Sequence, residues 1–170
     1  CDPMDQRALW TRLCEAGQPM GLAPFGMRAM MSLRLDRFFG AWMREFSPDY
    51  TPAETGMARF IKWDKDFIGK AAAEAERDTP PARTLAVFEV DADDADVVAY
   101  EPIFIDGRVQ GFCTSGGYSH WTGKSIAYGL IPREQATPGL EVEIEILGDL
   151  RPARLLTDPI FDATGERMRA

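Results

Sequence analysis

The hydrophobic periodicity of the chain changes at Thr79-Pro80-Pro81-Ala82, and this change constrains the fold more than any other feature. Upstream, apolar residues recur at helical spacing, which predicts helices over 4–17, 24–39 and 66–77, with a weak strand at 57–63. Downstream, apolar and polar residues alternate, most clearly in LEVEIEIL at 140–147, which predicts short strands. We therefore predict an α+β protein. A helical part precedes residues 79–82, and a small antiparallel sandwich or barrel follows them.

Residues 106–131 predict a β-hairpin. Asp106-Gly107 lies between two β-rich apolar runs, a strong hairpin signal. We expect strands at 109–114 and 126–131, separated by a flexible turn at Ser115-Gly116-Gly117-Tyr118. The resulting loop would carry Tyr118, His120 and other binding groups on a rigid support. The alternative is a plain hairpin in which the glycines only satisfy turn geometry.

Composition excludes several classes of partner. The chain has 27 acidic and 19 basic residues, a formal net charge of −8. This charge argues against nucleic acid and against anionic membrane surfaces as partners. There is no apolar run of membrane-spanning length, and the first residues lack the features of a signal peptide. Three isolated cysteines indicate a reducing compartment, so we expect a cytoplasmic location.

No complete catalytic constellation emerges from the residues themselves. His120 is the only histidine and no CxxC occurs, so we predict no metal site. The chain has no GxSxG, P-loop or GxGxxG pattern. Four aspartates lie within 91–96, but they lack the spacing and closing glutamate of a calcium loop, which favours an exposed acidic turn. The remaining candidates for chemistry are Arg34, Glu54 and Lys124.

Four ordered motifs resemble the glycine-cleavage T-protein (aminomethyltransferase) family. Residues 25–36 contain FGMRA and SLRLD, similar to the family's G-x-x-A-x-x-S-L-R-L-E. TPAETGM at 51–57 and KDFIGK at 65–70 look like T-P-x-E-A-G-L and K-x-D-F-I-G-[RK]. TSGGYS at 114–119 with GKSIAYG at 123–129 resembles T-S-G-G-Y-S and G-K-S-I-A-L-G. Residues 40–42 (GAW) look closer to the folate-binding region of FAD-dependent dimethylglycine and sarcosine dehydrogenases.

The resemblance implies an architecture and a reaction. Residues 1–78 would be the C-terminal portion of a folate-binding aminomethyltransferase domain, and residues 84–168 its C-terminal β-barrel domain. The cofactor would be tetrahydrofolate, which accepts a one-carbon unit. The catalytic aspartate would lie upstream of this chain, as would any FAD-binding domain. Met30 stands where stand-alone T-proteins have a folate-contacting arginine, a departure that favours the dehydrogenase-fused branch.

The resemblance also implies site residues and partners. The matching positions point to five candidate folate contacts: Arg34, Glu54, Ser115, Tyr118 and Lys124. The partner would be the upstream part of the same polypeptide or a separate subunit, and we expect the isolated chain to be inactive. Two alternatives remain open. The chain would be a non-catalytic docking subunit of a multi-subunit complex resembling sarcosine oxidase, or part of a folate-dependent demethylase.

Overall fold

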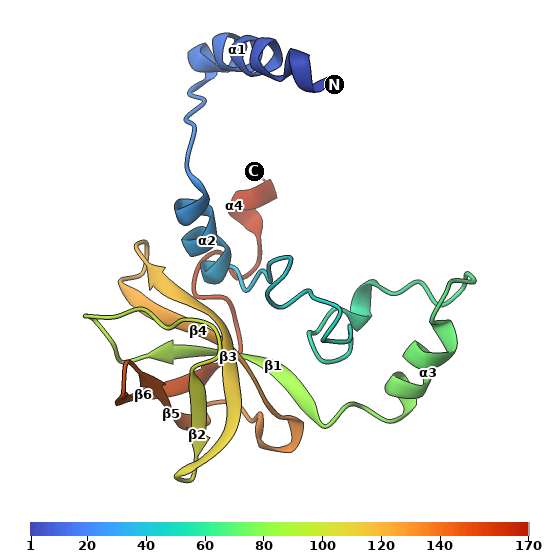
Figure 1. The fold of residues 1–170 in the computed structure, drawn as a ribbon, viewed down its shortest axis with the longest axis vertical. Helices are drawn as coiled ribbons and strands as arrows, with labels where there is room; N and C mark the ends of the chain where they lie inside the picture. The colour runs from blue at the N-terminus through green and yellow to red at the C-terminus, as the bar shows by residue number, and fades with distance from the viewer. Residues whose placement is uncertain (170) are drawn as a thin grey trace. The chain divides into compact units, whose positions relative to one another are not determined.

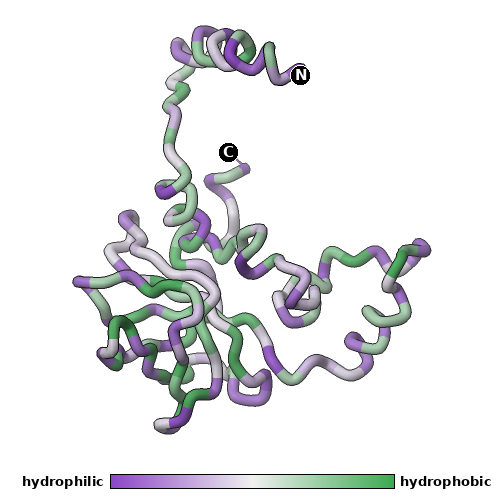
Figure 2. Tube along the Cα trace, viewed as in Figure 1, coloured by the Kyte–Doolittle hydropathy of each residue, from purple (hydrophilic) through white to green (hydrophobic). Residues whose placement is uncertain are grey.

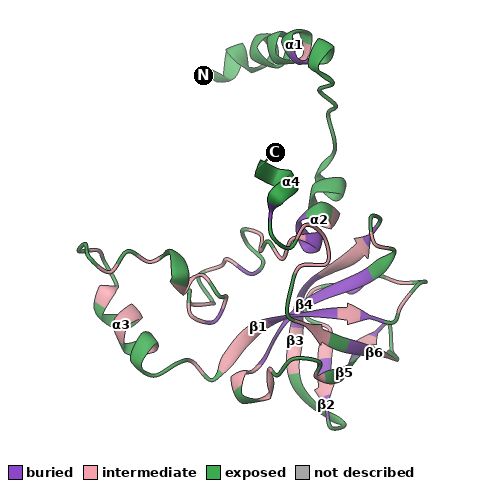
Figure 3. Cartoon of the chain, turned by 180° about the vertical axis from the view of Figure 1, so that it is seen from behind, coloured by how far each residue is buried: buried purple, intermediate pink, exposed green. Residues whose placement is uncertain are grey.

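The computed structural model describes residues 1–169 and divides the chain into two compact units, which are described separately. The first unit, residues 1–30, contains the 3-10 helix η1 (Pro3–Asp5), helix α1 (Gln6–Gly17) and the 3-10 helix η2 (Gln18–Met20). The Asp2 carboxylate accepts a hydrogen bond from the Met4 amide at 2.9 Å, and Pro3 lies in the first turn. Asp2 therefore caps η1, since a carboxylate there satisfies a free helical amide, whereas Asp5 at the start of α1 makes no side-chain cap. Most of α1 is exposed (Figure 3).

The second unit, residue 31 onward, begins within helix α2 (Met27–Asp36), which joins the two units in sequence. The helix is shorter than the predicted 24–39, because Phe38 adopts a left-handed backbone with φ 57° and ends it. Residues 37–66 then follow an irregular path whose only helix is η3 (Ala58–Phe60), so the strand predicted at 57–63 was wrong. Helix α3 (Lys70–Asp78) begins after Gly69, later than the start predicted at residue 66.

Six antiparallel strands form a closed barrel in the order β1-β4-β3-β2-β5-β6 (Figure 1). They are β1 (Arg83–Val90), β2 (Pro102–Ile105), β3 (Arg108–Ser119), β4 (Lys124–Pro132), β5 (Glu141–Ile146) and β6 (Asp149–Leu156). The 3-10 helix η4 (Arg133–Gln135) follows β4, and helix α4 (Glu166–Arg169) follows the barrel. Closure leaves no unpaired sheet edge to the solvent. The α+β prediction with an antiparallel barrel is confirmed.

The alternation predicted for β5 fills the barrel interior. Val142, Ile144 and Ile146 are buried, whereas Glu141 and Glu143 are exposed. Apolar and polar stretches follow each other along the barrel strands in Figure 2. The interior cluster also contains Phe88, Val97 and Ile103 among its fully enclosed members.

A second apolar cluster lies on the outer face of the barrel, against α2. Leu35 of α2 packs with Val87, Ile126 and Tyr128, and all four are buried. The Tyr128 hydroxyl donates a hydrogen bond to the Leu35 carbonyl oxygen at 3.2 Å, which satisfies a buried polar group. This cluster attaches the end of α2 to the barrel and so fixes the start of the irregular segment.

Candidate functional site

Two of the five predicted site residues meet at a carboxylate that the sequence did not single out, that of Glu45. Its side chain is completely buried. One carboxylate oxygen, Oε2, accepts from Arg34 Nη1 at 3.2 Å and from the Ala41 amide at 2.9 Å. The other, Oε1, accepts from Thr114 Oγ1 at 2.7 Å and from the Ser115 hydroxyl. Both oxygens are therefore satisfied from within the chain, as a buried carboxylate requires.

Glu45 and its four hydrogen-bond donors, here called the Glu45 cluster, hold the segment that follows α2. Arg34 Nη1 also donates to the Phe39 carbonyl oxygen at 3.0 Å, so one guanidinium joins the helix end to the turn. Phe38 and Met43 both have left-handed backbones, with φ 57° and 63°. Each such non-glycine residue costs about 1–3 kcal/mol. The four hydrogen bonds to Glu45 offset this strain, so Arg34 and Ser115 serve first to hold this turn.

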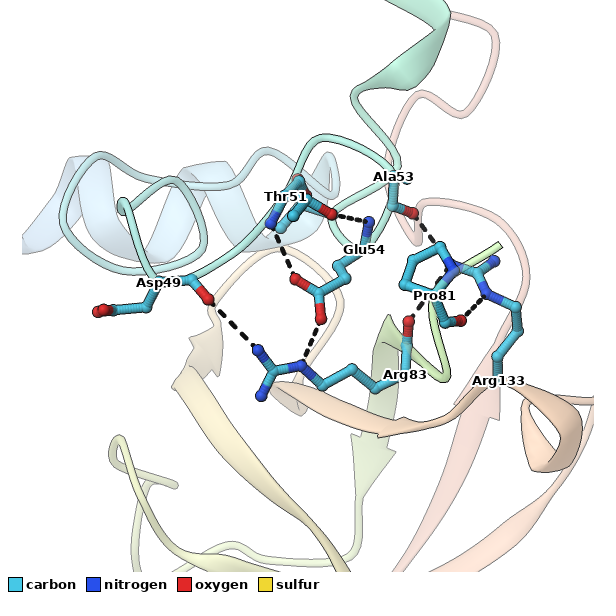
Figure 4. Close-up of polar contacts among 8 residues, drawn as sticks. Asp49, Thr51, Ala53, Glu54, Pro81, Arg83 and Arg133 are labelled. Carbon is cyan, nitrogen blue, oxygen red and sulfur yellow. Dashed lines mark hydrogen bonds and ion pairs between the residues drawn. The ribbon is translucent and has the colours of Figure 1, made fainter. Parts of the chain in front are cut away.

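Glu54 lies in a separate network that connects residues 49–54 to the first barrel strand (Figure 4). Its carboxylate accepts from Arg83 Nε and, through Oε2, from the Thr51 amide at 2.8 Å. Thr51 Oγ1 accepts from the Glu54 amide at 3.3 Å, which completes a reciprocal cap. The Arg83 Nη2 group also reaches the Asp49 carbonyl oxygen at 3.3 Å. Among the described residues, no hydrogen bond or ion pair joins Glu54 to the other four candidates.

The Glu54 carboxyl is held in its charged form. Burial acts to raise its pKa, but the hydrogen bonds from Arg83 and Thr51 outweigh burial, so the pKa is lowered from its ordinary value. A carboxyl whose pKa is lowered in this way is poorly suited to give up a proton near neutrality. Arg133 reinforces the junction from the other side, donating to the Pro81 carbonyl at 2.8 Å and the Ala53 carbonyl at 3.0 Å.

Tyr118 and Lys124 lie together at the end of the β3–β4 hairpin. Ser119 is opposite Lys124 and Tyr118 is opposite Ser125 in the strand register. Lys124 Nζ is 2.6 Å from Glu89 Oε1, and the Lys124 side chain is about half exposed. The Tyr118 ring packs edge-on against His120 with centroids 5.1 Å apart. Both side chains border an open groove of about 910 Å³ on the barrel, so they are accessible to a ligand.

The structure corrects the turn predicted at 115–118. These residues are part of β3, which pairs with β4 through to Ser119, and the hairpin loop is confined to 120–123. The two glycines are required for packing. A Cβ on Gly116 would collide with Val97 inside the barrel, and a Cβ on Gly117 would lie 3.2 Å from Leu35 Cδ1 of α2 on the outside. Adjacent residues of a strand face opposite sides, so two consecutive glycines admit neighbours on both faces.

Sequence reasoning missed Glu45, Arg83 and Arg133. Glu45 follows an exposed arginine in the sequence and resembles an ordinary surface residue, although it lies 69 and 70 positions from its partners Thr114 and Ser115. No local pattern marks such a pairing.

Within residues 1–169 there is no cluster of three or more His, Cys, Asp or Glu placed to hold a metal ion. Among the same residues, no helix has the length and apolar character needed to span a membrane.

Two family models match this chain. Residues 1–65 match the family model of the GCVT N-terminal domain, and residues 83–162 match that of the glycine cleavage T-protein C-terminal barrel domain. The two matches are consecutive and together span most of the chain. The chain belongs to the glycine cleavage T-protein family. The resemblance inferred from the four sequence motifs is thereby confirmed, whereas the domain boundary at 79–82 stays a prediction.

Relatives within and beyond the stand-alone T-proteins are similar to this chain. It is 37% identical to mitochondrial dimethylglycine dehydrogenase of Mus musculus over 97% of its length, which is 19% of that protein. It is 34% identical to an aminomethyltransferase of Desulfitobacterium hafniense over 92% of its length, which is 43% of that protein. The crystal structure of aminomethyltransferase T from Bartonella henselae shares the fold, with a TM-score of 0.81 and 23% identity, over 92% of this chain and 44% of that one. The chain thus spans less than half the length of each.

Proposed function

We propose that this T-protein family chain is the C-terminal part of an enzyme that transfers a one-carbon unit to tetrahydrofolate. The observation that carries the proposal is the consecutive match to two T-protein domains. The second of them is the barrel, and an aminomethyltransferase shares this fold. When bound, tetrahydrofolate supplies the amines that accept the one-carbon unit.

The residues at the end of the β3–β4 hairpin fit part of a folate molecule. Tyr118 offers an aromatic ring and Lys124 a cation, beside a groove that is open to solvent. An aromatic ring can pack against the planar rings of folate, and an ammonium group can pair with its glutamate carboxylate. We propose these two as direct folate contacts. Arg34, Ser115 and Glu54 would support the site by holding the backbone around it, since all three are buried. Arg34 Nη1, the Ser115 hydroxyl and the Glu54 carboxylate each bond within the chain.

The reaction needs more than these residues provide. A one-carbon transfer site must orient the acceptor amines, exclude water and provide a carboxylate for proton transfer. Glu45 and Glu54 are both paired with arginine, and Asp36, at the end of α2, is only 2% exposed, so none of these three buried carboxylates is open to a ligand. We therefore propose that the reacting carboxylate lies in an upstream segment, and that the 170-residue chain alone is inactive.

We further propose that the parent polypeptide is fused to an FAD-dependent dehydrogenase that acts on dimethylglycine or sarcosine. It is supported by the 37% identity to a dimethylglycine dehydrogenase over nearly the whole chain. In such an enzyme, FAD held by an upstream domain would supply the oxidation of the N-methyl substrate. The segment described here would hold the folate acceptor.

The test uses the native polypeptide that carries this sequence, purified from its source cells. It is incubated with tetrahydrofolate and dimethylglycine labelled with ¹³C in the methyl groups, and the folate is analysed by mass spectrometry. We expect labelled methylene-tetrahydrofolate and a bound flavin. The same test is repeated with labelled sarcosine. If the folate stays unlabelled with both substrates, the proposed dehydrogenase fusion is rejected. Robust turnover by the 170-residue chain alone would contradict the need for an upstream carboxylate.

A further inference from the structure

We infer that the side chains of Phe39, Trp42 and Met43, here called the Trp42 surface, dock the part of the folate-binding domain that this chain does not contain. The inference rests on the proposed function and adds to it the face on which the two parts of the domain meet. The occupant is a folded upstream segment of the same polypeptide with an apolar contact patch, since the aminomethyltransferase relative carries the remaining length in one chain.

The first observation is the exposure of these residues. Phe39 is 46% exposed, Trp42 77% and Met43 67%, and the three lie within five positions of the chain. Single exposed apolar residues are ordinary, but large aromatic and sulfur side chains grouped on one turn are typical of interaction sites. Exposed apolar residues of the barrel, such as Leu147 and Val109, lie at or next to hairpin ends and outside the segment that matches the N-terminal domain.

The second observation is that the turn is rigidly held. The Ala41 amide is bonded to Glu45 Oε2, and the Met43 amide donates to the Phe46 carbonyl oxygen at 3.2 Å. Beneath the turn, a Cβ on Gly40 would collide with the Phe46 ring, so Phe46 packs directly against the backbone. A buried ion pair and the left-handed Met43 thus fix a turn that presents Trp42 to the solvent. Pre-organisation of this kind lowers the entropic cost of association.

The third observation identifies the occupant. The Trp42 surface lies within residues 1–65, which match the GCVT N-terminal domain, and not within the barrel. The aminomethyltransferase relative has more than half of its length outside the matched region. A domain shared between this chain and that remaining length must bury apolar surface at their junction. Residues 1–65 expose other apolar side chains, Phe25, Met27, Leu33 and Phe60 among them, but the Trp42 surface is the group held in place by the buried contacts of Glu45.

The direct test is hydroxyl-radical footprinting with mass spectrometry, because tryptophan and methionine are oxidised readily when exposed. The native polypeptide, with any subunit that co-purifies with it, is compared with the isolated 170-residue chain. We expect Trp42 and Met43 to be oxidised several-fold more slowly in the native form, and Leu147 to react equally in both. Equal oxidation of Trp42 in the two forms would overturn the inference, as would a native form that consists of this chain alone.

A variant pair provides a second readout. The chain and the upstream segment of its parent are co-expressed as separate polypeptides, and their association is measured by co-purification and titration. Trp42→Ser should weaken association at least about tenfold, whereas Leu147→Ser should leave it unchanged. Both variants should unfold in urea like the unaltered chain, since both side chains are mostly exposed. Unchanged association of Trp42→Ser would overturn the inference.

Folate chemistry is measured separately, so the two proposals can fail independently. Protection of Trp42 without transfer to folate would reject the proposed function and keep the docking surface. Transfer to folate with Trp42 fully exposed would keep the proposed function and reject the docking surface.

Discussion

The barrel and the segment between α2 and α3 are stabilised by different interactions. The barrel is held by strand pairing and by an apolar interior in which Phe88, Ile103 and Ile144 are wholly buried. Residues 37–66 contain one short 3-10 helix and are held by two buried carboxylates, Glu45 and Glu54, each paired with an arginine. Apolar packing tolerates modest changes of shape, but a buried ion pair fails when one partner is lost. The segment between α2 and α3, most of which matches the GCVT N-terminal domain, therefore depends on a few specific polar contacts.

The largest effect should come from breaking the more buried of the two pairs. Glu45→Ala removes the acceptor of four hydrogen bonds and leaves the Arg34 guanidinium buried without its partner. Such a loss typically costs about 3–5 kcal/mol of the free energy of unfolding. Urea unfolding measures this cost, and amide hydrogen exchange at Ala41 localises it. Exposed Glu143→Ala is the control and should change stability by less than about 0.5 kcal/mol. A loss for Glu45→Ala no larger than the control would contradict the role assigned to this carboxylate.

The second pair should give a smaller, pH-dependent effect. Because the pKa of Glu54 is lowered on folding, its contribution is present above the pKa of the unfolded chain. That contribution is lost as the pH falls through the lower pKa of the folded state. Glu54→Gln should cost about 1.5–3 kcal/mol at neutral pH, the usual worth of a hydrogen bond to a charged group.

Unfolding measured from pH 7 down to pH 3 checks this prediction. The difference between Glu54→Gln and the unaltered chain should shrink as the pH falls. A difference that stays constant over this range would show that the charge of Glu54 is not what connects residues 49–54 to β1.

A third prediction tests the close packing that stabilises the barrel. Gly129→Ala places a Cβ against the Ile103 side chain and 2.9 Å from the Phe112 carbonyl oxygen. Overpacking of this kind costs about 1–3 kcal/mol. Thermal unfolding should show the loss, whereas Gly26→Ala, where nothing lies within 4 Å, should be neutral or slightly stabilising. Equal stability of the two variants would mean that the barrel wall yields at this contact.

The smallest effect on stability should come from the hairpin end. Lys124→Met removes an exposed ion pair with Glu89, which contributes about 0–1 kcal/mol. The same variant, made in the native polypeptide, should nevertheless weaken folate binding. Lys62→Met, another exposed lysine, serves as the control for loss of charge. A Lys124→Met polypeptide with unaltered folate affinity would remove Lys124 from the site.

The barrel could be predicted from the sequence, whereas the contacts of the segment between α2 and α3 could not. The barrel was predictable because strand periodicity is local, as in residues 140–147, and because Asp106-Gly107 has the left-handed geometry that a tight hairpin turn requires. The glycines at 116 and 117 misled the prediction because their partners, Val97 and Leu35, are distant in sequence. The Glu45 cluster was invisible for the same reason. Family motifs located Arg34 and Ser115, but only the structure shows that they meet at one carboxylate.

The most direct test of the central claim is equilibrium binding of a stable folate, 5-formyltetrahydrofolate, followed by calorimetry. The native polypeptide and the isolated 170-residue chain are titrated under the same conditions. We expect saturable binding to the native polypeptide and weak or undetectable binding to the isolated chain, because we propose that the site is shared with an upstream segment. No binding to the native polypeptide would contradict the proposed folate dependence. Equally tight binding to both would contradict the shared site.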